Sequence, residues 1–207
     1  MNPLDSRLAA GMEALALPHT PQQRDKLLAF LALMQKWNRA YNLTAIRDLG
    51  AAVDLHLLDS LAVSPHLPGG RVLDVGTGAG LPGIPLAVLR EDCAFTLLDS
   101  SAKKTRFVQQ AIIELGLKNV DVATARVEQY RPGQGYGCVL CRAFASLETI
   151  VSSTSRLLAP GGRILAQKGV WPQAELATLK NLSVRVHRLA IPGVEAERHL
   201  VEIMVDS

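Results

Sequence analysis

The sequence predicts an α/β fold in which a mostly parallel, seven-stranded sheet follows an N-terminal helical extension. From Arg71 onward, short apolar segments alternate with amphipathic ones, which is typical of parallel strands with helices on both faces. Before about Leu67, apolar residues recur at helical spacing instead. A glycine-rich segment directly after the first apolar stretch indicates that the sheet carries a ligand-binding turn.

Residues 1–67 are expected to form the helical extension. Thr20 and Pro21 are typical of an N-cap and a first helical position, and Gln23 is placed for a capping box. A further helix is expected over residues 49–64. Residues 68–207 form the second part, and we expect both parts to pack as one compact unit. The first of these helices is marked by five apolar residues at helical spacing: Leu27, Leu28, Leu31, Met34 and Trp37.

The second part is expected to alternate strands and helices. Its last two strands are joined without a helix, which predicts an antiparallel pair at the end of a parallel sheet. The expected strands cover residues 71–75, 94–99, 120–123, 137–142, 163–168, 183–189 and 199–205. The expected helices cover residues 81–89, 102–115, 147–158 and 171–179.

The composition is that of an ordinary soluble protein. Of 207 residues, 48% are hydrophobic and 20% are charged, and the net charge is +3, which allows a nucleic-acid partner without selecting one. The longest apolar run, residues 27–34, is too short to cross a bilayer. The first 17 residues lack the order of a secretory signal. We therefore expect a cytoplasmic protein with no membrane partner. We also expect it to act as a monomer.

The cysteines do not predict a metal or redox site. Cys138 and Cys141 form a C-x-x-C pair inside an expected strand. Residues three apart on a strand point to opposite faces, so the two thiols cannot share one metal ion. No second pair at metal-binding spacing is present in the sequence.

The glycine-rich turn permits two interpretations. Gly78-x-Gly80-x-x-Gly83, with Asp99 at the end of the next strand, fits a dinucleotide-binding pattern and an NAD-dependent oxidoreductase. Asp74, however, stands at the mouth of the first strand, where its carboxylate would repel a pyrophosphate and suits a cationic ligand. Asp99 can accept hydrogen bonds from ribose hydroxyls in either case, so it does not discriminate.

The same turn, read in the register Asp74-x-Gly76-x-Gly78-x-Gly80, resembles the first motif of class I S-adenosylmethionine methyltransferases. Across nearly the whole length, the chain resembles the bacterial family of 16S ribosomal RNA guanine-N7 methyltransferases, RsmG or GidB. One departure is Cys141, where a serine is expected. The matching motifs are WNRAYNLT (37–44), HLLDS (56–60), DVGTGAGLPGIP (74–85), LLDS (97–100), KKxRF (103–107), RVE (126–128), RAFAS (142–146), QKG (167–169) and ERHL (197–200).

The resemblance implies a Rossmann-like class I methyltransferase fold with S-adenosylmethionine as cofactor. It implies methyl transfer to N7 of one guanine in the 530 loop of 16S rRNA, with the rRNA or the small ribosomal subunit as partner. A class I methyltransferase with another substrate is the nearest alternative. The cofactor contacts that the resemblance implies are Gly76, Leu81, Val127, Glu128 and Arg142; the residues themselves add Asp74, Gly78, Gly80 and Asp99.

The chemistry that the resemblance implies needs no general base. Guanine N7 carries an in-plane lone pair and no proton, so the enzyme has only to align it with the methyl group. Arg142 is expected to hold the guanine and Phe144 to stack on it; the alternatives are a structural ion pair for Arg142 and core packing for Phe144. Expected contacts to RNA phosphates are Lys103, Lys104, Arg106, Arg126 and Lys168.

Overall fold

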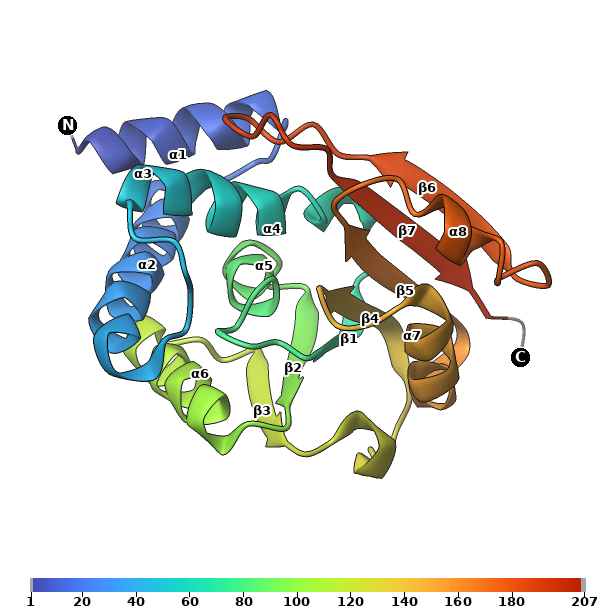
Figure 1. The fold of residues 1–207 in the computed structure, drawn as a ribbon. Helices are drawn as coiled ribbons and strands as arrows, with labels where there is room; N and C mark the ends of the chain where they lie inside the picture. Colours follow the sequence, from blue (N-terminus) through green and yellow to red (C-terminus); the bar gives the residue numbers. More distant parts are fainter. Residues whose placement is uncertain (1, 206–207) are drawn as a thin grey trace.

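The computed structural model describes residues 2–205 and confirms the predicted seven-stranded sheet (Figure 1). The strand order is β3-β2-β1-β4-β5-β7-β6. Pairs among β1 to β5 are parallel, whereas β7 runs antiparallel to both β5 and β6. The strands are β1 (Gly70–Val75), β2 (Cys93–Asp99), β3 (Val120–Thr124), β4 (Tyr136–Arg142), β5 (Leu158–Lys168), β6 (Ser183–Arg188) and β7 (His199–Met204).

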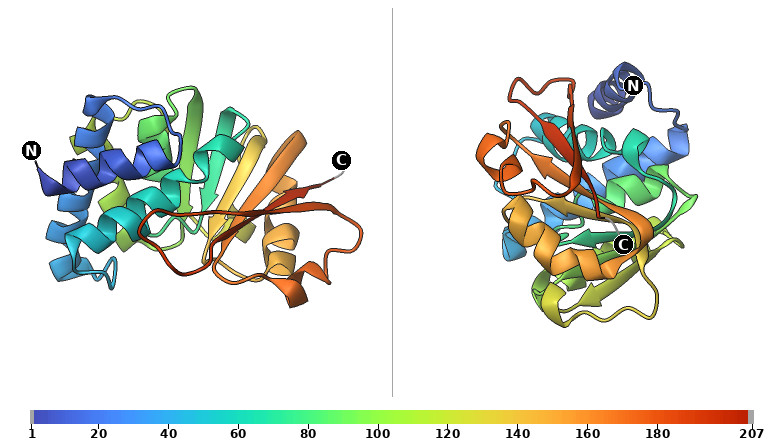
Figure 2. Two further views of the ribbon diagram at one scale, coloured as in Figure 1. Left: turned by 90° about the horizontal axis from the view of Figure 1, so that it is seen from above. Right: turned by 90° about the vertical axis from the view of Figure 1, so that its right-hand side faces the viewer.

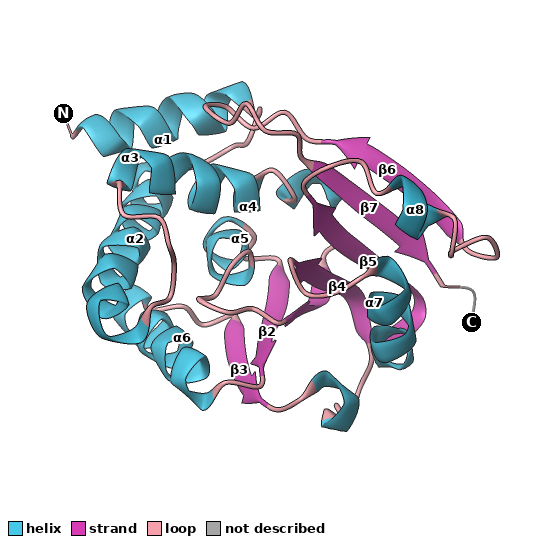
Figure 3. Cartoon of the chain, viewed as in Figure 1, coloured by secondary structure: helices cyan, strands magenta, loops and turns pink. Residues whose placement is uncertain are grey.

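Helices cover both faces of the sheet (Figure 3). One face packs against α5 (Gly83–Leu89), α6 (Ala102–Leu115) and the N-terminal helices, and the other packs against α7 (Leu147–Thr154). Cys138 belongs to the first core cluster and Cys141 to the second, so the two cysteines face opposite sides, as the strand periodicity predicts. Both thiols are buried and free, and burial raises the pKa of each.

The N-terminal helices pack onto the sheet through a continuous core. They are α1 (Pro3–Ala14), α2 (Pro21–Tyr41), α3 (Leu49–Ala52) and α4 (Asp59–Leu61), and a π-helical segment, η1 (Val53–Leu58), joins the last two. The predicted capping box at Thr20 and Gln23 is present. One core cluster contains residues of these helices and of the sheet. Figure 2 shows the blue and cyan N-terminal helices gathered against one side of the sheet.

The helices expected over residues 81–89 and 147–158 are shorter in the structure, at Gly83–Leu89 and Leu147–Thr154, and two further elements differ more. Strand β5 begins at Leu158 rather than at Arg163, because its pairing with β4 includes an irregularity that accommodates Pro160-Gly161-Gly162 within the strand. The helix predicted over residues 171–179 is reduced to α8 (Gln173–Leu176). That short helix buries none of its residues, so packing does not extend it. No helix among residues 2–205 is long and apolar enough to cross a membrane.

Candidate functional site

A cavity of about 300 Å³ opens at the carboxyl ends of β1, β2, β3 and β4, the edge where ligands bind in open α/β sheets. Seven predicted site residues line it: Gly76, Asp99, Lys104, Arg126, Val127, Glu128 and Phe144. Eight others do not: Asp74, Gly78, Gly80, Leu81, Lys103, Arg106, Arg142 and Lys168. The structure thus brings seven of the fifteen predicted site residues together at one cavity.

The glycine turn connects β1 to α5 in a conformation that other residues rarely adopt. Gly76, Gly78 and Gly80 have φ angles of +71°, +60° and +80°, in the left-handed region that favours glycine. The turn is tied to β2, because the amides of Gly76 and Thr77 both donate to the Leu98 carbonyl, at 2.8 and 3.1 Å. The backbone is thus fixed beside the cavity before any ligand arrives.

Asp74 lies beneath this turn and is fully buried. Its Oδ2 accepts hydrogen bonds from the Thr77 hydroxyl at 2.7 Å and from the Gly83 amide at 3.0 Å. Its Oδ1 has no hydrogen-bond partner among the described residues. Burial raises the pKa of Asp74 from 3.8 to about 6. Asp74 therefore holds the turn together and keeps one buried acceptor free; its predicted contact with a cationic ligand stays a prediction.

The raised pKa makes stability depend on pH. Folding favours the protonated carboxyl, so the folded protein loses stability as the pH rises from about 4 to about 6 and Asp74 ionises. Asp74→Asn keeps an acceptor oxygen for Thr77 and Gly83 and cannot ionise. We expect the variant to gain about 1.4 kcal/mol over the parent for each pH unit in this window, measured by urea unfolding without ligand. An unchanged difference in stability between the variant and the parent across this window would contradict the prediction. Asp121→Asn, at an exposed acidic residue, controls for the change of charge.

Asp99 closes the cavity on the side of β2. Its Oδ2 accepts from the Gly78 amide and its Oδ1 accepts from the Ser101 amide, both at 2.9 Å. Asp99 is only 8% exposed and lines the cavity. Each carboxylate oxygen can accept more than one hydrogen bond, so both oxygens keep capacity for a ligand. The structure thus orients the carboxylate that the sequence assigned to ribose.

A short helical turn forms the wall beyond β3. The 3-10 helix η3 (Val127–Gln129) follows Arg126, and both Val127 and Glu128 line the cavity. Val127 is buried and Glu128 is exposed. The Ala125 amide donates to the Asp99 carbonyl at 3.2 Å, which keeps this wall against the end of β2.

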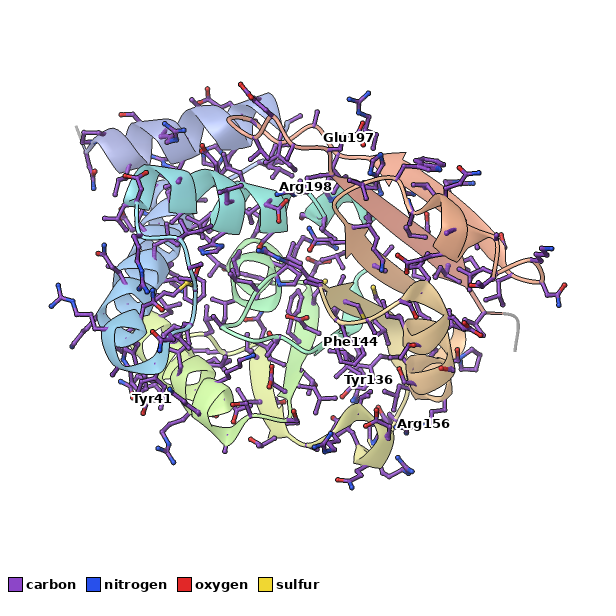
Figure 4. All side chains as sticks on the ribbon, viewed as in Figure 1. Tyr41, Tyr136, Phe144, Arg156, Glu197 and Arg198 are labelled. Carbon is purple, nitrogen blue, oxygen red and sulfur yellow. The ribbon has the colours of Figure 1, made fainter. Side chains whose placement is uncertain are left out.

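Phe144, labelled in Figure 4, lines the cavity beside the glycine turn. A Cβ built on Gly76 would lie 2.7 Å from Cδ2 of Phe144, so the ring packs directly on the turn. The preceding Ala143 has a φ of +48°, a strained conformation for a residue with a side chain. The phenyl ring is partly buried and combines packing with a position at the cavity.

Arg142 does not line the cavity and is held by residues of the N-terminal extension. Its Nη1 lies 3.2 Å from Oδ2 of Asp59, and Arg198 Nε lies 2.9 Å from Oδ1 of the same carboxylate. Asp59 is buried, while each guanidinium is about one quarter exposed. The ion pair considered for Arg142 is therefore present. The sequence did not predict that Asp59 pairs with both Arg142 and Arg198. The three residues come from separate motifs, and no local pattern connects them.

Of the five basic residues predicted to contact RNA phosphates, four are exposed and one forms an ion pair within the protein. Lys104 and Arg126 line the cavity, and Arg106 is exposed on α6. Lys103 Nζ lies 4.9 Å from the ring centroid of Tyr41 on α2 and remains exposed. Lys168 differs, because its Nζ pairs with Glu175 at 2.8 Å and donates to the Ala145 carbonyl. Its charge is thus compensated within the protein. Residues 2–205 contain no cluster of His, Cys, Asp or Glu suited to a metal ion.

Known sequences place this chain in a specific group. The family described as rRNA small subunit methyltransferase G, GidB, matches residues 23–201. The protein named ribosomal RNA small subunit methyltransferase G in Methylococcus capsulatus is 53% identical over 197 residues, which cover 95% of this chain and 96% of that protein. A match of this extent includes the N-terminal helices from α2 onward as well as the sheet.

Solved structures show that the fold is that of class I methyltransferases. A SAM-dependent methyltransferase from Aquifex aeolicus aligns with a TM-score of 0.57 at 18% identity, covering 75% of this chain and 93% of that one. Coclaurine N-methyltransferase, in a structure with N-methylheliamine and SAH, aligns with a TM-score of 0.57 at 16% identity, covering 90% of this chain and 66% of that one. At these identities the likeness concerns the arrangement of strands and helices.

Proposed function

Because this chain belongs to the rRNA small subunit methyltransferase G family, we propose that it uses S-adenosylmethionine to methylate N7 of a guanine in the 530 loop of 16S rRNA. The observation that carries the proposal is the cavity at the carboxyl ends of β1 to β4, enclosed by the glycine turn, Asp99 and η3. Family membership favours this over the NAD-dependent oxidoreductase.

The residues around the cavity fit S-adenosylmethionine. Asp99 offers a carboxylate to the ribose hydroxyls, and Val127 with Glu128 offers a wall to the adenine. The free, buried Oδ1 of Asp74 supplies negative charge beneath the turn, which suits a ligand that carries a sulfonium and an ammonium group. Gly76 has no side chain, which allows the Phe144 ring to pack against the turn beside the cavity. A volume of about 300 Å³ is at the lower end of small-ligand pockets.

The proposed reaction asks for positioning rather than proton transfer. When bound, S-adenosylmethionine supplies the methyl group in activated form. Guanine N7 attacks through its lone pair and has no proton to lose. The protein has to hold the base in line and keep water away. Phe144, at the cavity mouth beside Gly76, offers a ring for stacking, and Lys104 and Arg126 offer charge to neighbouring phosphates.

We further propose that residues 1–67 are an extension of a methyltransferase domain formed by residues 68–207, and that the enzyme acts as a cytoplasmic monomer. The extension supports Arg142 through Asp59, so it shapes the side of the site where the RNA is expected.

The proposed function is tested by mapping methylated bases in 16S rRNA from cells with and without this gene. We expect N7 methylation of one guanine in the 530 loop to disappear with the gene and to return with the wild-type copy. In parallel, S-adenosylhomocysteine should raise the melting temperature of the purified protein, and NADH should not. An unchanged modification pattern would reject the substrate, and stabilisation by NADH alone would reject the cofactor.

The exposed cations on α6 should contribute to RNA binding without affecting the cofactor. We expect Lys103→Glu to weaken binding of a 530-loop RNA about three- to tenfold at low salt, because it replaces attraction to phosphates with repulsion. Lys118→Glu makes the same charge change just before β3, at the amino ends of the strands, away from the cavity. This variant serves as the control. Affinity for S-adenosylhomocysteine should be unchanged in both. Equal loss of RNA binding in the two variants would argue against a localised surface.

A further inference from the structure

The η3 turn receives hydrogen bonds from arginine side chains outside it. It is a single turn of three residues, and no side chain caps its N-terminus. Short 3-10 turns have poor hydrogen-bond geometry and little stability of their own. Yet two of its residues, Val127 and Glu128, form a wall of the cavity. What fixes this turn therefore also fixes that wall.

Two arginines bind the carbonyl groups at the outer side of the turn. Arg156, in the 3-10 helix η4 (Ser155–Leu157), donates from Nη2 to the Val127 carbonyl and from Nη1 to the Tyr130 carbonyl, the latter at 2.8 Å. Arg131 donates from Nη1 to the carbonyls of Glu128 at 2.6 Å and Tyr130 at 3.0 Å. Figure 4 shows Arg156 beside the segment between β3 and β4.

The two arginines differ in what they connect. Arg131 is three residues from Glu128, so it makes contacts within one loop. Arg156 is 29 residues from Val127 in sequence and follows α7, so it anchors the turn to another element of the fold. A guanidinium is planar and forks two donors, which allows Arg156 to span two carbonyls. Arg156 does not line the cavity and acts through the backbone of the turn.

We propose that Arg156 is a positioning residue for the cofactor: it holds η3 where Val127 and Glu128 receive the adenine end of S-adenosylmethionine. This inference rests on the proposed function for the identity of the ligand. It assigns Arg156 no contact with the reacting atoms. Loss of Arg156 therefore weakens cofactor binding and leaves methyl transfer intact once the cofactor is bound.

The test compares Arg156→Ala, Arg156→Lys and a matched control. Arg90 also donates from Nη1 to carbonyls beside a 3-10 turn, those of Ser64 and Leu67, at 2.9 and 3.4 Å. It lies at the amino ends of the strands, away from the cavity. Arg90→Ala thus reproduces the loss of a carbonyl-binding arginine without touching η3. Calorimetry with S-adenosylhomocysteine and steady-state methylation of small-subunit particles are measured for all four proteins, including the wild type.

We expect Arg156→Ala to raise the Kd for S-adenosylhomocysteine and the KM for S-adenosylmethionine about tenfold, as loss of one or two hydrogen bonds would. Its kcat at saturating cofactor should stay within about twofold of wild type. Arg156→Lys should recover part of the affinity, since an ammonium can reach one carbonyl. Arg90→Ala should bind like wild type.

Three results would overturn the inference: unchanged affinity in Arg156→Ala, an equal loss in Arg90→Ala, or a fall in kcat with KM unchanged. Failure of the wild-type protein to bind S-adenosylhomocysteine would instead reject the proposed cofactor, and the inference with it. The two failures are distinguished by the wild-type titration alone.

Discussion

Asp99→Ala should reduce affinity for S-adenosylhomocysteine at least about a hundredfold. The substitution removes the carboxylate that we expect to bind ribose, and hydrogen bonds to charged groups contribute about 1.5–3 kcal/mol each. It also releases the amides of Gly78 and Ser101, which Asp99 now orients at 2.9 Å each. Loss of ligand contacts and loosening of the turn therefore act in the same direction. Isothermal titration calorimetry at neutral pH measures the effect.

Asp121→Ala is the matched control for this change. Asp121 is an exposed acidic residue near the start of β3 and does not line the cavity. It should bind S-adenosylhomocysteine like wild type, which separates the role of Asp99 from a general change in charge. Asp99→Ala that remains folded by circular dichroism and keeps its affinity within about threefold would refute the assignment of this carboxylate to the cofactor.

The sequence predicted those features of the site that depend on the local order of residues. A buried strand followed by closely spaced glycines determines that a turn forms there and which edge of the sheet it faces. Asp99 was found because it ends the next strand, and parallel strands bring their carboxyl ends together. The sheet in Figure 1 confirms this placement. These predictions required only the alternation of elements, which is visible in the chain.

The remaining features depend on contacts between distant segments. Arg142 and Lys168 were expected to face the RNA, since both stand at the ends of strands. In the structure Arg142 pairs with Asp59 of α4, and Lys168 pairs with Glu175 of α8. The sequence does not specify how these two helices pack. Arg156 was overlooked for the same reason, because its carbonyl partners belong to another loop. The sequence can place a charged residue at an edge of the sheet, but it cannot identify the residue that pairs with it.

The pairing of Arg142 with Asp59 changes how the site is understood. A buried carboxylate shared by two arginines leaves a local surplus of one positive charge, and both guanidiniums stay partly exposed. Each therefore keeps donors for a further acceptor, so an ion pair and a substrate contact are compatible roles for Arg142. The pair also makes the orientation of Arg142 depend on α4 in the N-terminal extension.

Gly83→Ala should destabilise the protein far more than an ordinary glycine substitution. Gly83 begins α5, where alanine would normally improve helix propensity. A Cβ here would lie 2.2 Å from Cδ2 of Leu97 and 2.7 Å from Oδ2 of Asp74, both within the buried interior. The clash with Leu97 forces repacking, at a cost of about 1–3 kcal/mol. Displacement of Asp74 endangers its bonds to Thr77 and to the Gly83 amide, adding about 1–2 kcal/mol.

Gly116→Ala separates this packing effect from backbone strain. Gly116 has a φ of +61° and nothing within 4 Å of an added Cβ, so its substitution should cost only the left-handed penalty of about 1–2 kcal/mol. We expect Gly83→Ala to lose about 3–4 kcal/mol in urea unfolding and to bind S-adenosylhomocysteine more weakly, while Gly116→Ala binds normally. Equal stability of the two variants would show that the interior beneath the turn can relax. That result would contradict the inference, drawn from their contacts, that Asp74 and Gly83 hold the glycine turn in place.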